Sequence, residues 1–523
     1  MKRAAWALLP LAIVLLLAAQ LLRTRPVADS SPLTQAGCPR CNLVLLSLDS
    51  LRADRLAAYG GKRGVTPNLD RWAKGAIVFR NYSSASTLTP ISQATVHTGL
   101  FPERNGVVDY RSKISPSVPT LSELLRAEGY ATAAISTSPD FDVYPGFRES
   151  FGRGLDKFEL LGKFDYPFFK ALDWLKARER EKRPFFLWLA LSSAHWPYGT
   201  NVKNKFADPG YRGPFKDVHR FPFAPSQNLL FQLLFDGVLY PRTPSTNFWF
   251  WNFVKAKVHW PFAGQTKPLV LAPADLEQIR NLYDNNVADL DEKITILWDA
   301  LAAPAFAKNT VVVLLSEHGE DLHDHGSFHH HDLWQTILSV PLLLRTPAEP
   351  TGRVVDTAAS GVDVLPTLLA HLGLKPAAAT DGRDLLAAGA ATTHPVFSVR
   401  TPLWETVLNV KGHSEPFDRF REFNGRARFK DYAVRMENWK LIHRRSIPAV
   451  ELFSLRKYVT GKAAVLSEFE LYDLEKDPGE TINLHASHPV PLSRLKPLLL
   501  EFERRMTAQA ATDGSKGAFQ EYF

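Results

Sequence analysis

The stretch that decides the fold is Thr310-Val311-Val312-Val313-Leu314-Leu315-Ser316-Glu317-His318-Gly319-Glu320. Its first half is apolar and β-branched, which predicts a strand that is buried on both faces. A carboxylate and an imidazole, Glu317 and His318, follow directly at the carboxyl end of that strand. Open α/β sheets place their ligands at this end of their strands. The stretch therefore predicts a central strand that leads into a functional site.

A second apolar run, residues 42–48, has the same character and ends in Asp49. Two such strands would deliver Asp49, Glu317 and His318 to one edge of one sheet. Two carboxylates and one imidazole are ordinary ligands of a divalent metal ion. The competing interpretation is that Asp49 caps the following helix and that His318 is a turn residue.

A third segment, residues 86–99, is typical of a loop that runs into a helix, and hydroxyl side chains crowd its entry. Backbone N–H groups and the helix dipole stabilise an oxygen that develops charge at a helix N-terminus. A neighbouring metal ion would lower the pKa of such a hydroxyl further and make it a useful nucleophile. The simpler alternative is an ordinary Ser or Thr cap.

These segments resemble the sulfatase family of the alkaline-phosphatase superfamily, and the resemblance extends over residues 42–485. The matching segments, in chain order, are residues 48–54, 59–60, 66–70, 98–103, 193–198, 316–320, 362–367 and 471–480. The resemblance implies an α/β fold, with a mixed sheet between helices and a smaller C-terminal α+β subdomain. It also implies a metal ion held by Asp49, Glu317 and His318.

The family motif places the nucleophile at Thr89, in contact with the metal ion, and a substrate histidine at His195. Counting back from the helix that follows the second metal segment gives His329 as a further substrate histidine, with His330 and His331 as neighbouring alternatives. Thr87 is the next candidate for the nucleophile.

Three positions depart from the family pattern. Thr89 stands where sulfatases carry the Cys or Ser that is oxidised to formylglycine, and Gln93 stands where the motif has arginine. Glu317 replaces the usual aspartate. Superfamily members with threonine at this position resemble phosphodiesterases, phosphatases and phosphoryl-group transferases. We therefore expect a hydrolase or transferase that acts on phosphoester or phosphodiester bonds through Thr89.

Two other functions remain open. One is a sulfuric ester hydrolase, as in most of the family. The other is a catalytically silent, membrane-anchored relative that only binds anions or partners, since Gln93 and Glu317 break the family motif.

A single metal ion is expected. Two-metal members of the superfamily carry an additional Asp-x-x-x-His pair, and the nearest candidate, Asp284, has Ala288 instead of histidine four residues later. Asp284 and Asp291 are therefore interpreted as helix-surface or packing residues. The metal ion would be Mn²⁺, Mg²⁺, Ca²⁺ or Zn²⁺.

The N-terminus combines Lys2 and Arg3 with an apolar run over residues 4–22. That length approaches the ~20 residues that span a bilayer, and no cleavage site follows at once, which favours a signal-anchor over residues 1–25 rather than a cleaved signal peptide. The catalytic domain would then lie in the periplasm or outside the cell. In such an oxidising compartment Cys38 and Cys41 could form a small disulfide.

Composition and patterning suggest the remaining organisation of the 523-residue chain. We expect a linker over residues 26–41, a catalytic domain over 42–375 and a C-terminal subdomain over 376–523. Residues 200–272 form an aromatic-rich insertion, interpreted as a lid or wall packed on the sheet or, alternatively, as a lipid-contacting surface.

The net charge of +8 is spread along the chain, without a nucleic-acid-binding module. This charge favours an anionic substrate or a membrane surface over nucleic acid. Together with the family resemblance, it leads us to expect an anionic ester substrate that is linked to a lipid or a glycan. The oligomeric state does not follow from the sequence.

Overall fold

The computed structural model describes residues 37–110, 112–162, 167–181, 183–195, 198, 205–206, 208–213, 272–325, 328–330, 332–376, 378–387, 393–401, 430–445 and 467–512. The expected signal-anchor over residues 1–25 and most of the aromatic-rich insertion over 200–272 lie outside these residues. In the part of the chain that is described, no helix combines the length and the apolar character needed to cross a bilayer.

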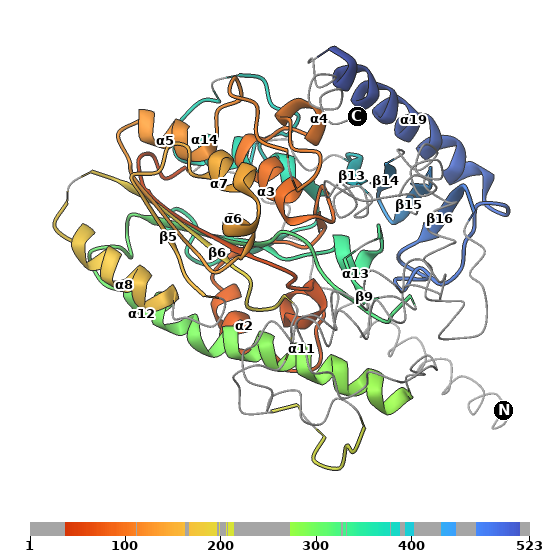
Figure 1. The fold of residues 1–523 in the computed structure, drawn as a ribbon, viewed down its shortest axis with the longest axis horizontal. Coiled ribbons are helices and arrows are strands. Elements are labelled where there is room, and N and C mark those ends of the chain that lie inside the picture. The colour runs from red at the N-terminus through yellow and green to blue at the C-terminus, as the bar shows by residue number, and fades with distance from the viewer. Residues whose placement is uncertain are drawn as a thin grey trace, which may run out of the picture.

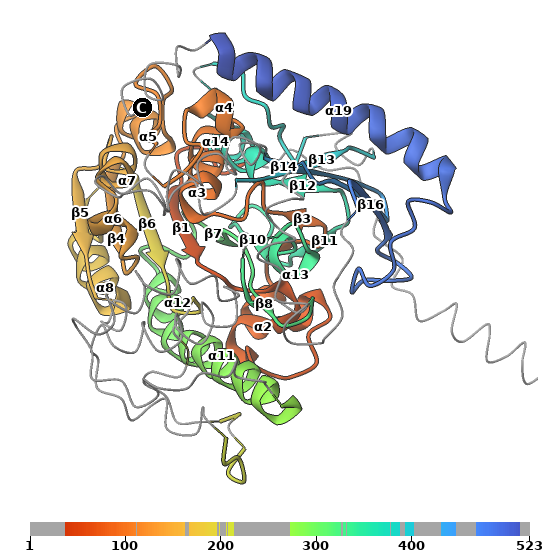
Figure 2. The same ribbon diagram turned by 45° about the vertical axis from the view of Figure 1, so that its right-hand side comes forward.

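The core of the molecule is a mixed sheet of eight strands (Figures 1 and 2). Their order across the sheet is β11 (Arg353–Val355), β2 (Ile77–Phe79), β10 (Leu342–Arg345), β7 (Thr310–Ser316), β1 (Asn42–Leu48), β6 (Phe185–Leu191), β4 (Ala131–Ser136) and β5 (Lys157–Leu160). Every neighbouring pair runs parallel except those that β10 makes with β7 and β2. The predicted strands at 42–48 and 310–316 therefore lie side by side in the middle of the sheet.

Side chains of the central strands alternate between two apolar layers. In β1, Val44 and Leu46 face one layer, whereas Leu43 and Leu45 face the other. Because both faces are covered, these strands have continuous apolar sequences rather than alternating ones. This is why the sequence pattern alone identified them.

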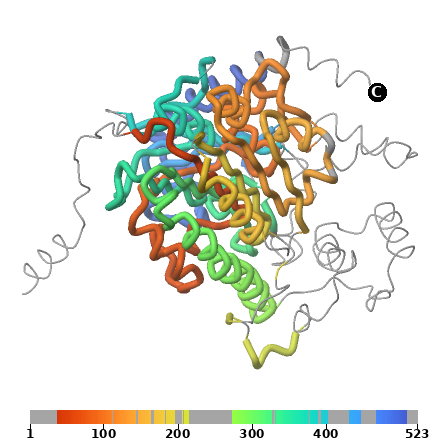
Figure 3. The backbone as a smooth tube through the Cα atoms, turned by 90° about the vertical axis from the view of Figure 1, so that its left-hand side faces the viewer, coloured from red at the N-terminus to blue at the C-terminus, as the bar shows by residue number. Residues whose placement is uncertain are grey.

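Helices cover both faces of the sheet (Figure 1). One layer contains α2 (Pro67–Ala73), α8 (Pro167–Arg178), α11 (Pro273–Lys293) and α12 (Thr295–Leu301). The other contains α3 (Thr89–Thr98), α5 (Leu121–Ala127), α6 (Asp140–Val143), α7 (Pro145–Phe151) and α14 (Val364–His371). Figure 3 shows the two layers from another side, with α11 in green at the lower end and the segment of α5 to α7 in orange above.

Short elements connect these layers. They are the 3₁₀ turns Ala53–Arg55, Ala57–Tyr59 and Gly361–Asp363, the helices α4 (Pro102–Asn105) and α13 (Gln335–Leu338), and the two-stranded pairs β3 (Tyr82–Ser83) with β12 (Ala359–Ser360) and β8 (Asp321–Leu322) with β9 (Phe328–His329). The turn at Gly99 ends α3 in the left-handed region, with φ 67°. A Cβ at this position would approach Thr380 Cγ2 to 2.9 Å, so a side chain here would be both strained and crowded.

The C-terminal part forms a separate antiparallel sheet that packs beside the main one (Figure 2). Its strands, in order, are β13 (Val396–Arg400), β14 (Asp431–Met436), β15 (Trp439–His443) and β16 (Phe469–Asp473), and α19 (Pro489–Thr512) lies against them. The α+β character expected for this part of the chain is confirmed. The expected disulfide between Cys38 and Cys41 is also present, with a Cα–Cα distance of 5.5 Å.

Candidate active site

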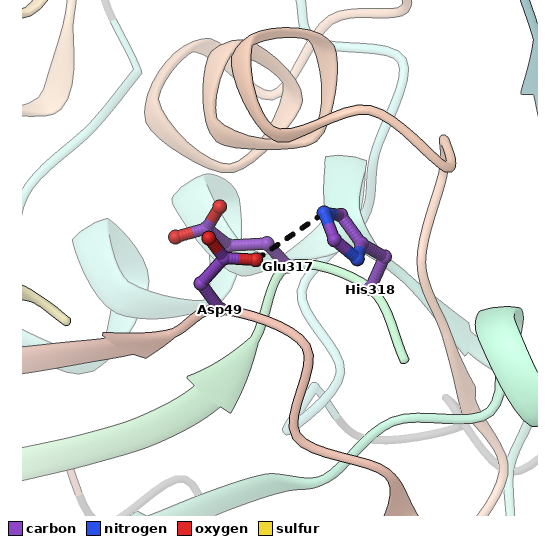
Figure 4. Close-up of side chains that lie close together, drawn as sticks. All are labelled: Asp49, Glu317 and His318. Carbon is purple, nitrogen blue, oxygen red and sulfur yellow. Dashed lines mark ion pairs between the residues drawn. The ribbon is translucent and has the colours of Figure 1, made fainter. Parts of the chain in front are cut away.

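The site begins where β1 and β7 end side by side. Their register pairs Leu48 with Ser316, so the next residues of both strands emerge at the same edge of the sheet. Figure 4 shows Asp49, Glu317 and His318 pointing toward one another from these strand ends. One ligand atom from each residue lies within 4.8 Å of the others, and all three side chains are buried. The juxtaposition predicted from the two apolar runs is confirmed.

The tautomer of His318 follows from its neighbours. Its Nδ1 lies 3.0 Å from the carbonyl oxygen of Gly319, and a carbonyl can only accept, so Nδ1 carries the proton. The Nε2 lone pair then faces Asp49 Oδ1 at 3.4 Å and Thr89 Oγ1 at 3.1 Å. Burial lowers the pKa of His318 and favours this neutral form. The hydrogen bond to Gly319 therefore presents Nε2 as a ligand atom.

The carboxylates of the site repel one another unless a cation lies between them. Burial, followed by the nearby Asp49 and Asp140, raises the pKa of Glu317 well above its usual range. Burial and then Asp49 raise the pKa of Asp140 to about 7. The Oε2 atom of Glu317 is buried and has no hydrogen-bond partner. Such orphaned acceptor atoms are expected where a ligand or ion completes the site.

These residues fit a divalent cation. Asp49, Glu317 and Thr89 offer oxygen atoms and His318 offers one nitrogen, a donor set that suits Mn²⁺, Mg²⁺ and Zn²⁺, with Ca²⁺ less favoured by the imidazole. Among the described residues, this cluster is the one group of three or more acidic, histidine or cysteine side chains close enough to hold a metal ion.

Thr89 is the first residue of α3, and it is almost fully buried, with 2% of its surface exposed. Pro90 follows it, and a proline fits the first turn of a helix because its missing N–H is not needed there. The side chains of Tyr110 and Thr89 also share a hydrogen bond. The Thr89 oxygen therefore lies at a helix N-terminus, near both a phenol and the His318 imidazole.

Two histidines after β7 share one carboxylate. His329 and His330 direct Nδ1 to Glu320 Oε1 and Oε2 respectively, each at 3.3 Å. His330 also stacks on His318 with ring centroids 4.0 Å apart, and its ring lies 5.3 Å from that of His195. A left-handed backbone at His329, with φ 67°, rotates the chain between these two residues. The structure thus places His330, rather than His329, beside the expected site, while His331 lies outside the described residues.

Asp284 and Asp291 are fully buried, so their interpretation as helix-surface residues was wrong and their interpretation as packing residues was right. Asp284 forms ion pairs of 2.6 Å with Arg55 and with Arg63. Asp291 accepts hydrogen bonds from the backbone N–H groups of residues 68 and 69. Both carboxylates are thus bound by protein groups that lie more than 200 positions earlier in the chain.

The sequence analysis missed two residues of the site, Tyr110 and Asp140. Asp140 follows β4, a parallel strand whose carboxyl end lies at the same edge of the sheet, and this position was a usable signal. Tyr110 lies in an irregular segment after α4, where no periodicity points to the site.

The fold and this site define a class of protein, the α/β enzymes with an alkaline-phosphatase-like sheet. The chain belongs to the sulfatase family, whose family model, Sulfatase, matches residues 41–374. The N-acetylglucosamine-6-O-sulfatase of Bacteroides thetaiotaomicron is 24% identical over 494 residues, which cover 85% of this chain and 82% of that protein.

Two solved structures share the fold. One is a protein in complex with its substrate D-glucosamine-2-N,6-O-disulfate, with a TM-score of 0.60 and 20% identity over 91% of this chain and 99% of the other. The other is a phosphonate monoester hydrolase of Agrobacterium radiobacter, with a TM-score of 0.59 and 19% identity over 90% of this chain and 96% of the other.

Proposed function

We propose that this protein is a metal-dependent ester hydrolase or transferase in which Thr89 is the nucleophile, and that it acts on phosphoester or phosphodiester bonds. The observation that carries the proposal is the position of Thr89 Oγ1, 3.1 Å from Nε2 of His318 at the N-terminus of α3. A hydroxyl placed beside a ligand set and a helix N-terminus has the surroundings that activate a weak nucleophile.

A divalent cation held by Asp49, Glu317, His318 and Thr89 would lower the pKa of the Thr89 hydroxyl and polarise the ester oxygens. Thr89 Oγ1 then attacks phosphorus in line, the bond from phosphorus to the leaving alkoxide breaks, and a phospho-threonine forms. Water or an acceptor alcohol attacks that phosphorus next, and the Thr89 oxygen leaves and regains its proton.

His195 and His330 have different roles in this proposal. His330 directs Nδ1 to Glu320 Oε2 at 3.3 Å, and burial followed by His318 lowers its pKa well below the usual range, so it is neutral. Because its Nδ1 proton is bound to Glu320, the neutral His330 ring offers the lone pair of Nε2 and can orient a hydrogen-bond donor of the substrate. His195 is partly exposed, and we assign it the proton transfer to the leaving group.

Sulfuric ester hydrolysis is the second candidate, and the named relative, an N-acetylglucosamine-6-O-sulfatase, supports it at least as well as the first. Against it stands Thr89, because a sulfo-threonine has no equivalent of the elimination that a formylglycine hydrate allows. A glycan-linked anionic ester is the substrate that both candidates share. The N-terminal apolar run supports a membrane-anchored enzyme outside the cytoplasm.

Initial rates on aryl phosphate, phosphodiester, phosphonate monoester and aryl sulfate, each with several divalent cations, test the proposal. We expect phosphorus esters to be turned over faster than the sulfate ester by orders of magnitude. Faster turnover of the aryl sulfate would establish the second candidate instead. No turnover of any ester by a folded, metal-loaded protein would establish a silent relative.

A further inference from the structure

A chain of buried polar groups lies behind the metal-site carboxylate Glu317. The indole Nε1 of Trp188 donates to Ser47 Oγ at 3.0 Å, and Ser47 Oγ donates to Gln93 Oε1 at 3.5 Å. The amide Nε2 of Gln93 donates in turn to Glu317 Oε1. All four side chains belong to residues that are no more than 2% exposed, so water does not compete for these bonds.

The direction of this chain is fixed by its first member. An indole N–H can only donate, so Ser47 must accept from Trp188 and its own proton is left for Gln93. Gln93 Oε1 is thereby committed as an acceptor, and its Nε2 must face Glu317. The opposite amide orientation would set a carbonyl oxygen against a carboxylate in a buried site, which is strongly unfavourable.

Helix α3 also holds the backbone of Glu317. Ser92 Oγ donates to the carbonyl oxygen of Glu317 at 2.5 Å, and Ser84 Oγ donates to the same oxygen. The N–H of Glu317 donates to the carbonyl of Leu48 at 3.3 Å. With the backbone and Oε1 held in this way, Oε2 is the one polar atom of Glu317 that has no partner.

We infer that Gln93 is a positioning residue, which with Trp188 and Ser47 turns Glu317 so that Oε2 faces the divalent cation. Two of the three departures from the family pattern, Gln93 and Glu317, then form one matched pair. Glu317 is longer than aspartate by one methylene and reaches back to Gln93, whereas the shorter, neutral Gln93 takes the place of arginine. Because Gln93 carries no charge, it orients the carboxylate without competing with the cation for it.

The inference rests on the proposed cation site, and calorimetric titration of the purified full chain with Mn²⁺ tests it independently of any substrate. Gln93→Leu should weaken Mn²⁺ binding by about 10- to 100-fold, the usual cost of removing a group that orients a ligand. Trp188→Phe should also weaken Mn²⁺ binding, but by a smaller factor. It removes only the N–H donor that fixes the direction of the hydrogen bonds from Ser47 to Glu317. Tyr130→Phe, a buried change in the same apolar layer at a hydroxyl without a partner, should leave binding unchanged.

The matched pair is tested by exchange. Gln93→Arg and Glu317→Asp should each weaken Mn²⁺ binding, and the double variant should recover affinity to within about threefold of the unaltered protein, since residues in contact couple. Circular dichroism checks that each variant is folded. If Gln93→Leu does not fold, Trp188→Phe, which changes the site less, takes its place in the titration. Unchanged Mn²⁺ binding in the folded Gln93 variants, or a double variant no better than the weaker single one, overturns the inference. Absence of Mn²⁺ binding by the unaltered protein overturns the cation site itself.

Discussion

The Oδ1 atom of Asp49 lies 3.4 Å from Nε2 of His318, although the proton of that imidazole is on its other nitrogen. Two atoms that both carry lone pairs, buried and facing each other, require a proton or a cation between them. Glu317 adds a further unpartnered oxygen to the same space. This arrangement leads to a prediction about pH and metal binding.

Stabilisation by Mn²⁺ should increase as the pH rises. Burial and neighbouring carboxylates raise the pKa of Glu317 in the metal-free fold, so its protonated form is favoured and the stability of that fold falls as the pH rises through this pKa. The cation binds the deprotonated form and reverses the trend. Thermal unfolding with and without Mn²⁺, between about pH 5 and about pH 8, measures the effect. A gain in melting temperature that is flat or falls with pH would contradict it.

His330 should matter more than His329. His330→Ala removes the ring that stacks on the expected metal ligand His318 beside His195, and we expect kcat/KM to fall by about 10- to 100-fold, the usual cost of removing a group that orients a ligand. His329→Ala removes a contact to Glu320 and should have a smaller effect. Steady-state kinetics of the two variants with the same substrate compare the two losses of kcat/KM. A larger loss for His329→Ala would contradict this prediction and favour His329, the histidine predicted from the sequence.

The C-terminal sheet should depend on a buried ion pair. Lys440 Nζ lies 2.6 Å from Glu480 Oε1, and both side chains are almost inaccessible. Lys440→Met leaves an unpaired buried carboxylate and should lower the free energy of unfolding by about 3–5 kcal/mol. Denaturant unfolding of this variant and of the double variant Lys440→Met/Glu480→Gln measures the loss of unfolding free energy in each.

The double variant should be the more stable of the two, because it removes the uncompensated charge. Arg494→Ala is the matched control, since Arg494 pairs with Glu437 at the exposed surface and such pairs contribute less than about 1 kcal/mol. If Lys440→Met and Arg494→Ala lowered the free energy of unfolding equally, burial would not be the cause of the destabilisation.

The sequence predicted the framework of the site because local signals specified it. The runs at 42–48 and 310–316 are apolar throughout, which is the mark of strands covered on both faces, and their polar ends were bound to meet once the strands were neighbours. The position of Thr89 came from the family motif, and the structure brings it to the same cluster.

The features that the sequence left open depend on distant or subtle geometry. Three consecutive histidines provide no periodicity that separates His329 from His330, and the left-handed backbone at His329 has no sequence signal. Asp284 was left open between a helix-surface and a packing residue because its ion-pair partners, Arg55 and Arg63, lie more than 200 positions earlier in the chain.

The central claim is that Thr89 attacks phosphorus. Rapid quenching of the metal-loaded protein with radiolabelled aryl phosphate, followed by peptide mapping, measures this directly. Thr98→Ala, a change at a hydroxyl that bonds within the same helix, serves as the control. We predict label on Thr89, its loss in Thr89→Ala and its persistence in Thr98→Ala. Label on Thr87 or on another residue, or a covalent adduct that forms only from aryl sulfate, would contradict the claim.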